Sequence, residues 1–247
     1  MKREIISKRM IAFLIAFFML ATMAPFVTRT GVSHGASNWE TEDNDSRSKA
    51  DAITVNSTWY GKIGEEYDED YYWFRTSQAG VVTVNFQHPY VNSPNDYWYV
   101  ELQDEDGDRI LAQDIKGTQT NVTFTKMGLP AGVYYIEIQD ASYGYSHSSV
   151  TYDLRANFSA SSVWETEEND WYTRADTVRI GTRFYGNIGY YNQYDDDYYW
   201  FPVSRKTKLN LNFSHGYINS AEEYWTVEVY DQNRDDHTMK LKKGTIL

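Results

Sequence analysis

The chain has 247 residues, of which 35 are acidic and 23 are basic, and it contains no cysteine. Its net charge of −12 repels nucleic acid and anionic lipid, so we expect neither as a partner, whereas divalent cations suit such a surface. High acidity can also indicate disorder, but aromatic residues make up 17% of the chain and predict a packed core.

The N-terminus has the pattern of a secretory signal peptide, which we place at residues 1–36. Four basic residues within the first nine precede an apolar run over residues 11–20. The alternative is an uncleaved membrane anchor, because apolar residues continue to Val27. Removing residues 1–36 leaves 18 basic and 34 acidic residues, a net charge of −16. We expect a bacterial protein that is secreted or held at the cell surface, with no membrane contact beyond the signal segment.

Three motifs occur twice in the same order. Residues 39–45 (WETEDND) return as 164–170 (WETEEND), residues 68–74 (DEDYYWF) return as 195–201 (DDDYYWF), and residues 86–90 (FQHPY) are echoed by 213–217 (FSHGY). The spacing of 125 to 127 residues is too long for a solenoid repeat and fits one whole domain per copy.

These repeats define the predicted domains. The first copy covers residues 37–158, a small-residue linker covers 159–163, and the second copy covers 164–247. Nothing in the second copy corresponds to residues 121–158, so we expect it to be truncated at its C-terminus. A sandwich without its late strands exposes apolar faces, so the second copy is predicted to be the less stable half.

Period-two patterns predict antiparallel strands in the first copy. The apolar positions are Val82, Val84 and Phe86, then Trp98, Val100 and Leu102, then Tyr134, Ile136 and Ile138. Turn signals fall between these stretches, and a short pattern at residues 48–52 is the one hint of helix. We therefore predict an all-β fold of tandem, jelly-roll-like antiparallel β-sandwiches. Trp98 and Phe86 should lie in the core, with Tyr99 on the opposite face of its strand.

The order of the motifs resembles a known family. The chain has an acidic E-x-E-x-N start at residues 40–44, a Gly-x-Ile at 61–63, a D-x-D-Y-Y-x-F strand at 68–74 and an L-P-A-G-x-Y-Y-I strand at 129–136. This set resembles the bacterial pre-peptidase C-terminal domain and is similar to the collagen-binding domains of clostridial collagenases. The resemblance implies a jelly-roll-like sandwich that is an accessory to a secreted enzyme. For the collagen-binding relatives it also implies calcium at the acidic segment.

Clustered acids with an asparagine predict a calcium site in each copy, because calcium binds six to eight oxygens from carboxylates, amides and backbone. The first-copy candidates are Glu40, Glu42, Asn44, Asp45, Asp68 and Asp70, and their second-copy counterparts are Glu165, Glu167, Asn169, Asp170, Asp195 and Asp197. Glu40, Glu42 and Asn44 alternate, so an extended segment presents them on one side. The resemblance places the first-copy set on ligand positions except Asp68, since the collagen-binding pattern has its Asp one residue earlier, where Tyr67 stands. The alternative is a solvated acidic turn.

Two further patterns have competing interpretations. Tyr90, Tyr97, Tyr99, Tyr143 and Tyr145 are candidates for a face that binds sugar or collagen, or are core and strand-surface aromatics that β-structure favours. Residues 104–108 (DEDGD) resemble the start of an EF-hand loop, but Arg109 stands where that loop needs Gly, so we predict a hairpin turn.

His88 and His215 recur at matched positions beside aromatic residues, and both are predicted to be structural.

The sequence contains no G-x-S-x-G, no H-E-x-x-H and no cysteine nucleophile, so we expect no catalysis. We predict a secreted, non-enzymatic binding or spacer protein built from calcium-stabilised modules. Its partner would be an extracellular protein of collagen type or a polysaccharide. The alternatives are a carbohydrate-binding module and the accessory remnant of a secreted peptidase or other hydrolase.

Overall fold

The computed structural model describes residues 38–141, 150–188, 195–216 and 225–231. Within these ranges the chain forms strands and turns and no helix, which confirms the all-β class. Accordingly, this part of the chain has no helix long and apolar enough to cross a membrane. The predicted signal segment, Tyr143 and Tyr145 lie outside the described residues.

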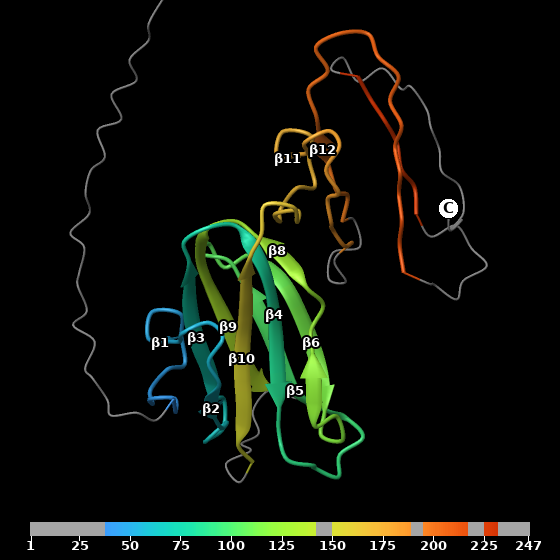
Figure 1. The fold of residues 1–247 in the computed structure, drawn as a ribbon. Helices are drawn as coiled ribbons and strands as arrows, with labels where there is room; N and C mark the ends of the chain where they lie inside the picture. The colour runs from blue at the N-terminus through green and yellow to red at the C-terminus, as the bar shows by residue number, and fades with distance from the viewer. Residues whose placement is uncertain (1–37, 142–149, 189–194, 217–224, 232–247) are drawn as a thin grey trace, which may run out of the picture.

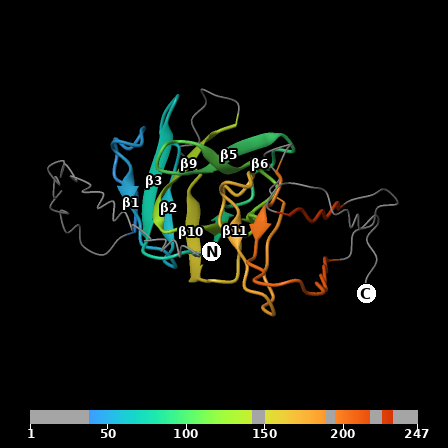
Figure 2. The same ribbon diagram turned by 90° about the horizontal axis from the view of Figure 1, so that it is seen from above.

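The first copy is a sandwich of two sheets (Figure 1). One sheet has the order β1 (Asp51–Ala52), β3 (Glu69–Thr76), β9 (Gly132–Asp140), β5 (Asp96–Gln103) and β6 (Arg109–Lys116). The other has the order β2 (Trp59–Gly61), β10 (Tyr152–Ala160), β4 (Gly80–Gln87) and β7 (Asn121–Thr123), and β8 (Met127–Leu129) also pairs with β4. Within the sandwich only β1 and β3 pair in parallel. Seen from above, β5 and β9 lie on one side and β2 and β10 on the other (Figure 2).

The core lies between the sheets, and alternate residues of the long strands fill it. The predicted apolar positions on β4, β5 and β9 are all buried. Trp98 and Phe86 are fully buried, and their ring centroids are 5.6 Å apart. Tyr99 is half-buried on the opposite face of β5. The predicted strand register is therefore confirmed.

The helical hint at residues 48–52 is wrong. The Lys49 N–H donates to the Ser46 carbonyl at 2.8 Å, which makes a single turn. Asp51 and Ala52 then form β1, whose partners on β3 are Tyr72 and Trp73. Pairing with a neighbouring strand thus overrides a weak local helix propensity.

Residues 104–108 form the predicted turn between β5 and β6. One carboxylate oxygen of Asp104, Oδ1, accepts the backbone N–H groups of Asp106, Gly107 and Asp108 at 2.8 to 2.9 Å. Gly107 has a φ of 93°, a conformation that suits glycine. An Asp side chain that binds the backbone of its own turn explains these acids without a cation.

The described residues of the second copy repeat local contacts of the first. Trp164 forms a parallel bridge with Tyr185, as Trp39 does with Tyr60. The short strands β11 (Asp176–Thr177) and β12 (Tyr199–Trp200) pair in parallel, as β1 and β3 do. The acidic segment and the strand after it are thus arranged alike in both copies.

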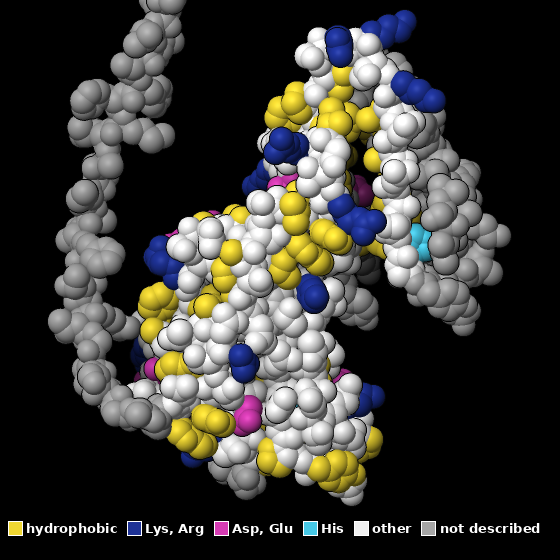
Figure 3. All heavy atoms as spheres, viewed as in Figure 1, with side chains coloured by type: hydrophobic (Ala, Val, Ile, Leu, Met, Phe, Trp, Pro, Cys, Tyr) yellow, Lys and Arg dark blue, Asp and Glu magenta, His cyan; other side chains and the backbone are white. Residues whose placement is uncertain are grey.

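The counterparts of core residues are exposed in the second copy. Tyr199 is 38% exposed and Leu209 is 37% exposed, whereas the matching Tyr72 and Val82 are 0% and 1% exposed. Among the described residues no strand besides β11 pairs with β12, so these side chains have no second sheet to pack against. Hydrophobic side chains accordingly reach the surface above the sandwich (Figure 3). The domain boundaries and the lower stability of this copy stay predictions.

Replacing Trp98 or Phe86 with Ala should lower the free energy of unfolding by about 3–5 kcal/mol, because each leaves a large cavity in the core. Replacing Tyr99 with Ala should cost much less, since its ring lies on the outer face. Chemical denaturation of the three variants measures this difference. Equal losses at Trp98 and Tyr99 would contradict the core assignment.

Candidate metal centre

The acidic segment of the first copy lies against strands of the sandwich. The Glu40 N–H donates to the Tyr60 carbonyl of β2 at 2.9 Å. The Thr41 N–H donates to Asp51 Oδ2 at 2.6 Å, which ties the segment to β1. These backbone contacts bring Glu40 and Glu42 over the start of β3, where Asp70 lies.

The predicted carboxylates come together there in two overlapping groups. Oxygens of Glu40, Glu42 and Asp70 lie within 4.8 Å of one another, and so do oxygens of Glu42, Asp45 and Asp68. Glu42 belongs to both groups. The structure therefore gathers all five predicted carboxylates of this copy, Asp68 included, into one cluster.

Hydrogen bonds from β3, β10 and the residue that follows β2 fix two of these carboxylates. Glu40 Oε1 accepts the Lys62 N–H at 2.9 Å, and Oε2 accepts the hydroxyls of Tyr72 at 3.0 Å and Tyr152 at 3.2 Å. Asp70 is fully buried and its Oδ2 also accepts from the Tyr152 hydroxyl. Because β3 and β10 belong to opposite sheets, the cluster is positioned by both layers of the sandwich.

Several oxygens in the cluster face other oxygens. Asn44 is fully buried, and its side-chain oxygen faces acceptors only. Turning the amide over would let its nitrogen donate to Asp70 Oδ1 at 3.3 Å and to Glu42 Oε2 at 3.2 Å. Asp68 is 5% exposed, and its Oδ1 is buried without a partner. Converging, unsatisfied oxygens are what a hard cation requires, so these residues fit a metal ion.

The electrostatics of the cluster agree with that geometry. Burial, followed by the charge of Asp68, raises the pKa of Glu42 to about 7. A hydrogen bond with Asp43, followed by burial, raises the pKa of Asp45 to about 6. Burial also raises the pKa values of Glu40 and Asp70. Without a positive charge the cluster thus disfavours full ionisation of its carboxylates.

The second copy has a matching cluster. Oxygens of Glu165, Glu167 and Asp197 lie within 4.8 Å of one another. Glu165 accepts from the Asn187 N–H and the Tyr199 hydroxyl, as Glu40 accepts from the Lys62 N–H and the Tyr72 hydroxyl. Burial and then the charge of Glu165 raise the pKa of Asp197 to about 7.

The other predicted residues of the second copy have different places. Asn169 is fully buried and its Oδ1 has no partner, as expected of a ligand oxygen. Asp170 Oδ1 accepts the Asp196 N–H at 3.3 Å, and burial, followed by the charge of Asp195, raises the pKa of Glu167. Asp170 and Asp195 do not belong to the three-carboxylate group.

Sequence reasoning missed the residues that hold the acidic segments in place. Asp51 accepts the Thr41 N–H, and in the second copy Asp176 accepts the Thr166 N–H at the same distance of 2.6 Å. The two aspartates are 125 residues apart, so the repeat itself contained the signal. No sequence pattern singled out Tyr152 of β10, whose hydroxyl contacts Glu40 and Asp70.

Comparison with known proteins supports the resemblance that the motifs indicated. No family model matches the chain. It is similar to Collagenase ColT of Clostridium tetani (strain Massachusetts / E88), with 25% identity over 195 residues, which cover 76% of this chain and 19% of that collagenase. Among solved structures it is similar to the pre-peptidase C-terminal domain of a collagenase from Bacillus anthracis, with 19% identity and a TM-score of 0.33 over 44% of this chain and 94% of that chain. The similarity to a clostridial collagenase bears out the predicted resemblance.

A second solved structure has a lower score. The ruminal GH26 endo-β-1,4-mannanase is 8% identical, with a TM-score of 0.28 over 49% of this chain and 22% of that chain. This chain matches only 19% of the length of Collagenase ColT.

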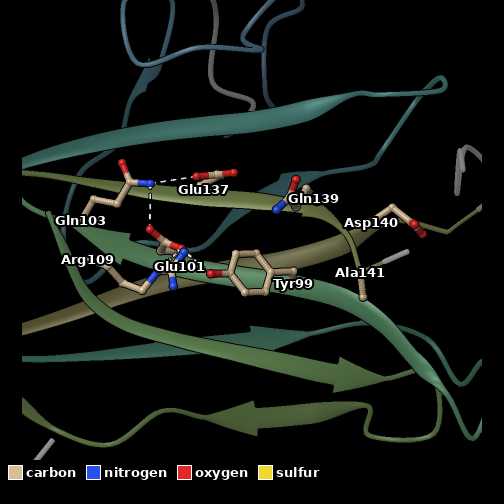
Figure 4. Close-up of a pocket in the computed structure, with 8 residues that line it drawn as sticks. All are labelled: Tyr99, Glu101, Gln103, Arg109, Glu137, Gln139, Asp140 and Ala141. Atoms are coloured by element: carbon tan, nitrogen blue, oxygen red, sulfur yellow. Dashed lines mark hydrogen bonds and ion pairs between the residues drawn. The ribbon is translucent and has the colours of Figure 1, made fainter. Parts of the chain in front are cut away.

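The outer face of the first sheet carries a polar hollow of about 440 Å³ (Figure 4). Its lining consists of Tyr99, Glu101, Gln103, Arg109, Glu137, Gln139, Asp140 and Ala141. Glu101, Gln103 and Glu137 are each at most 8% exposed, although strand alternation predicts a solvated face. They cover one another, since Gln103 Nε2 donates to Glu101 Oε1 at 3.0 Å and to Glu137 Oε2 at 2.8 Å.

The candidate binding tyrosines are only partly brought together. Tyr97 lies at an irregularity of β5 and packs against the core, edge-on to the Trp98 ring, whereas Tyr99 lies on the outer face. The Tyr99 hydroxyl donates to Glu101, and the Arg109 guanidinium lies 5.8 Å from the Tyr99 ring centroid. Tyr90 lies instead in the loop between β4 and β5 and is 66% exposed.

Glu137 should make unfolding pH-dependent. Burial raises the pKa of Glu137 above its ordinary value of 4.5, helped by the charges of Glu101 and Glu69 and opposed by hydrogen bonds from Tyr71 and Gln103. An acid with a raised pKa binds its proton more tightly in the folded state, so stability falls as pH rises through that pKa.

Glu137→Gln removes this titration. The variant should therefore gain stability relative to the natural chain as the pH rises from 4.5 to neutral. Urea unfolding across that range measures the difference, with Glu105→Gln in the exposed turn as the control. A constant difference between Glu137→Gln and the natural chain would contradict the raised pKa.

Proposed function

We propose that this chain is a calcium-stabilised, non-catalytic accessory module of a secreted bacterial protein, and that it binds an extracellular protein of collagen type. The observation that carries the proposal is the cluster of five carboxylates, in which a buried oxygen of Asp68 has no partner. The similarity to collagenases supports the class of partner.

Calcium suits the donor set of the cluster better than a softer metal does. The predicted ligands are carboxylates and one amide, which provide oxygen alone. Calcium takes six to eight such oxygens in flexible geometry, whereas zinc prefers nitrogen and sulfur donors. The hydrogen bonds that fix Glu40 and Asp70 hold part of the shell in place before a cation arrives. Bound calcium would supply positive charge and link the acidic segment to β3.

A non-catalytic role is supported by the surroundings of the two matched histidines. His88 is buried between the Phe86 and Trp98 rings, 5.8 Å from each, and its Nδ1 lies 2.8 Å from the Pro89 carbonyl oxygen. His215 has the same arrangement with Phe213 and Trp225. Both rings pack as structural residues, which agrees with the absence of hydrolase motifs in the sequence.

The outer face of the first sheet supports a protein partner over a polysaccharide. A sugar-binding platform needs free aromatic faces on which rings can stack. Arg109 lies near the Tyr99 ring, and the Arg47 guanidinium lies 4.4 Å from the Tyr135 ring centroid. The carboxylates and amides that line the hollow offer hydrogen-bond acceptors and donors to a peptide backbone instead.

Calcium should raise the melting temperature of the full chain, because a ligand that binds only the folded state adds about 2.7 kcal/mol of stability at a hundredfold excess over Kd. Glu42→Gln should remove most of that increase, since Glu42 belongs to both carboxylate groups of the first cluster. Glu105→Gln, in the exposed turn, should keep it. Equal melting temperatures in calcium and in chelator would sink the calcium assignment.

The chain should be retained by fibrillar collagen in calcium and not by cellulose or chitin. Tyr99→Ala should weaken collagen binding at least tenfold, since truncating a central aromatic of an interface costs about 2 kcal/mol or more and each 1.4 kcal/mol is about tenfold in affinity. Tyr172→Ala, an exposed tyrosine of the second copy, should bind as the natural chain does. Retention on the polysaccharides alone would favour the carbohydrate-binding alternative.

A further inference from the structure

The outer face of the second sheet carries a transverse row of side chains that crosses its strands from β2 to β7. Tyr60 on β2 pairs with Asp153 on β10. Asp153 pairs in turn with Gln87 on β4, and Gln87 pairs with Asn121 on β7. Trp39 extends the row beyond β2, because it forms a parallel bridge with Tyr60. Directly opposed residues share one face of a sheet, and all five are exposed except Asp153, which is half-buried.

Two aromatic rings stand at one end of this transverse row. The ring centroids of Trp39 and Tyr60 are 5.7 Å apart, and the two side chains are 42% and 37% exposed. Neither residue belongs to the hydrophobic core of the sandwich, so core packing does not account for the pair. The second copy repeats it, since Trp164 stacks on Tyr185 with centroids 6.0 Å apart and Tyr185 is 45% exposed. Hydrophobic side chains accordingly reach the surface over β2 (Figure 3).

The polar side chains of the row have no hydrogen-bond partner among the described residues. They are Asp153, Gln87 and Asn121. The next level of the same face differs, because there Asn85 Nδ2 donates to Thr123 Oγ1 at 2.6 Å. Burial raises the pKa of Asp153, so its carboxylate is partly withdrawn from water without a donor to compensate. The row therefore offers a ligand free acceptors and donors beside two aromatic rings.

This combination suits a neutral sugar chain. A pyranose ring has faces of C–H groups, which pack on aromatic rings, and a rim of hydroxyls, which carboxylates and amides bind. Neighbouring strands are about 4.8 Å apart, which is close to the length of one sugar unit, so consecutive units can each meet one strand. The net charge of −12 repels glycans that carry uronate or sulfate groups. The charge of the chain thus selects an uncharged glycan.

We propose that the outer face of the second sheet binds a single neutral glycan chain along the transverse row. Trp39 and Tyr60 stack against one sugar unit, and the three polar side chains bind hydroxyls of the units that follow. This site goes beyond the collagen-type partner proposed above, which was assigned to the outer face of the first sheet. Crystalline cellulose and chitin present several parallel chains in a flat face, which one aromatic pair does not cover. The expected lack of retention on those solids therefore stands.

Affinity electrophoresis of the full chain tests the proposal in native gels that contain galactomannan, xylan, soluble starch or hydroxyethyl cellulose. At least one of these neutral glycans should retard the chain, whereas alginate, a polyuronate, should not. Tyr60→Ala should weaken binding to the retarding glycan about tenfold or more, as expected of a central aromatic. Gln87→Ala should weaken it about fivefold, the net value of one hydrogen bond. Gln87 lies on β4, away from the acidic segment, so its loss leaves the carboxylate cluster intact.

Tyr90→Ala is the matched control, because Tyr90 is 66% exposed but lies in the loop between β4 and β5. It should bind the glycan as the natural chain does, and an equal loss in Tyr90→Ala and Tyr60→Ala would contradict the proposed row.

Retention on fibrillar collagen, measured in parallel, separates this site from the proposed function. A chain that no neutral glycan retards would overturn the glycan site, whatever its retention on collagen. If Tyr60→Ala then lost retention on collagen, the row would belong to the protein partner instead. A natural chain that a glycan retards but collagen does not retain would support the glycan site and overturn the proposed collagen-type partner.

Discussion

The arrangement of the first copy depends on a hydrogen-bonded set in which two tyrosine hydroxyls hold two carboxylates. Tyr72 comes from one sheet and Tyr152 from the other, and their hydroxyl oxygens are 2.7 Å apart. Together they bind Glu40 and Asp70. Burying two acids is unfavourable unless donors and a counter-charge compensate, and the hydroxyls supply only the donors. The two tyrosines therefore join the two sheets to each other and to the acidic segment. They leave the negative charge of Glu40 and Asp70 without a counter-charge.

The two copies show how the same residues acquire different properties from their surroundings. In the first copy a complete sandwich buries Tyr72 behind the cluster. In the second, Tyr199 stands in the same sequence position and stays partly exposed, while β8 of the first copy lies against the acidic segment. The first cluster therefore lies against the core of its own copy, whereas the acidic segment of the second cluster lies against β8 of the first copy.

Period-two patterns predicted the strands, because strand alternation depends on residues that are close in sequence. The repeated motifs predicted which acidic residues come together, because the same acidic residues occur in both copies. Period two placed Trp98 and Phe86 in the core correctly. Other features depend on long-range pairing, which no local pattern encodes. Glu101 and Glu137 alternate outward as predicted, yet neighbours on adjacent strands bury them. Tyr152 reaches Asp70 across 82 positions, and Asp51 joins β1 rather than a helix.

The position of β1 has a consequence for assembly. A sheet ends in a row of backbone groups that can pair with another molecule, and long unprotected edges promote aggregation. The segment that carries Glu40 and Glu42 continues into β1, which pairs with Tyr72 and Trp73 along the outer side of β3. Asp51 holds both together by accepting the Thr41 N–H. The segment that carries the carboxylate cluster therefore also covers part of the outer border of β3, where another chain could otherwise pair.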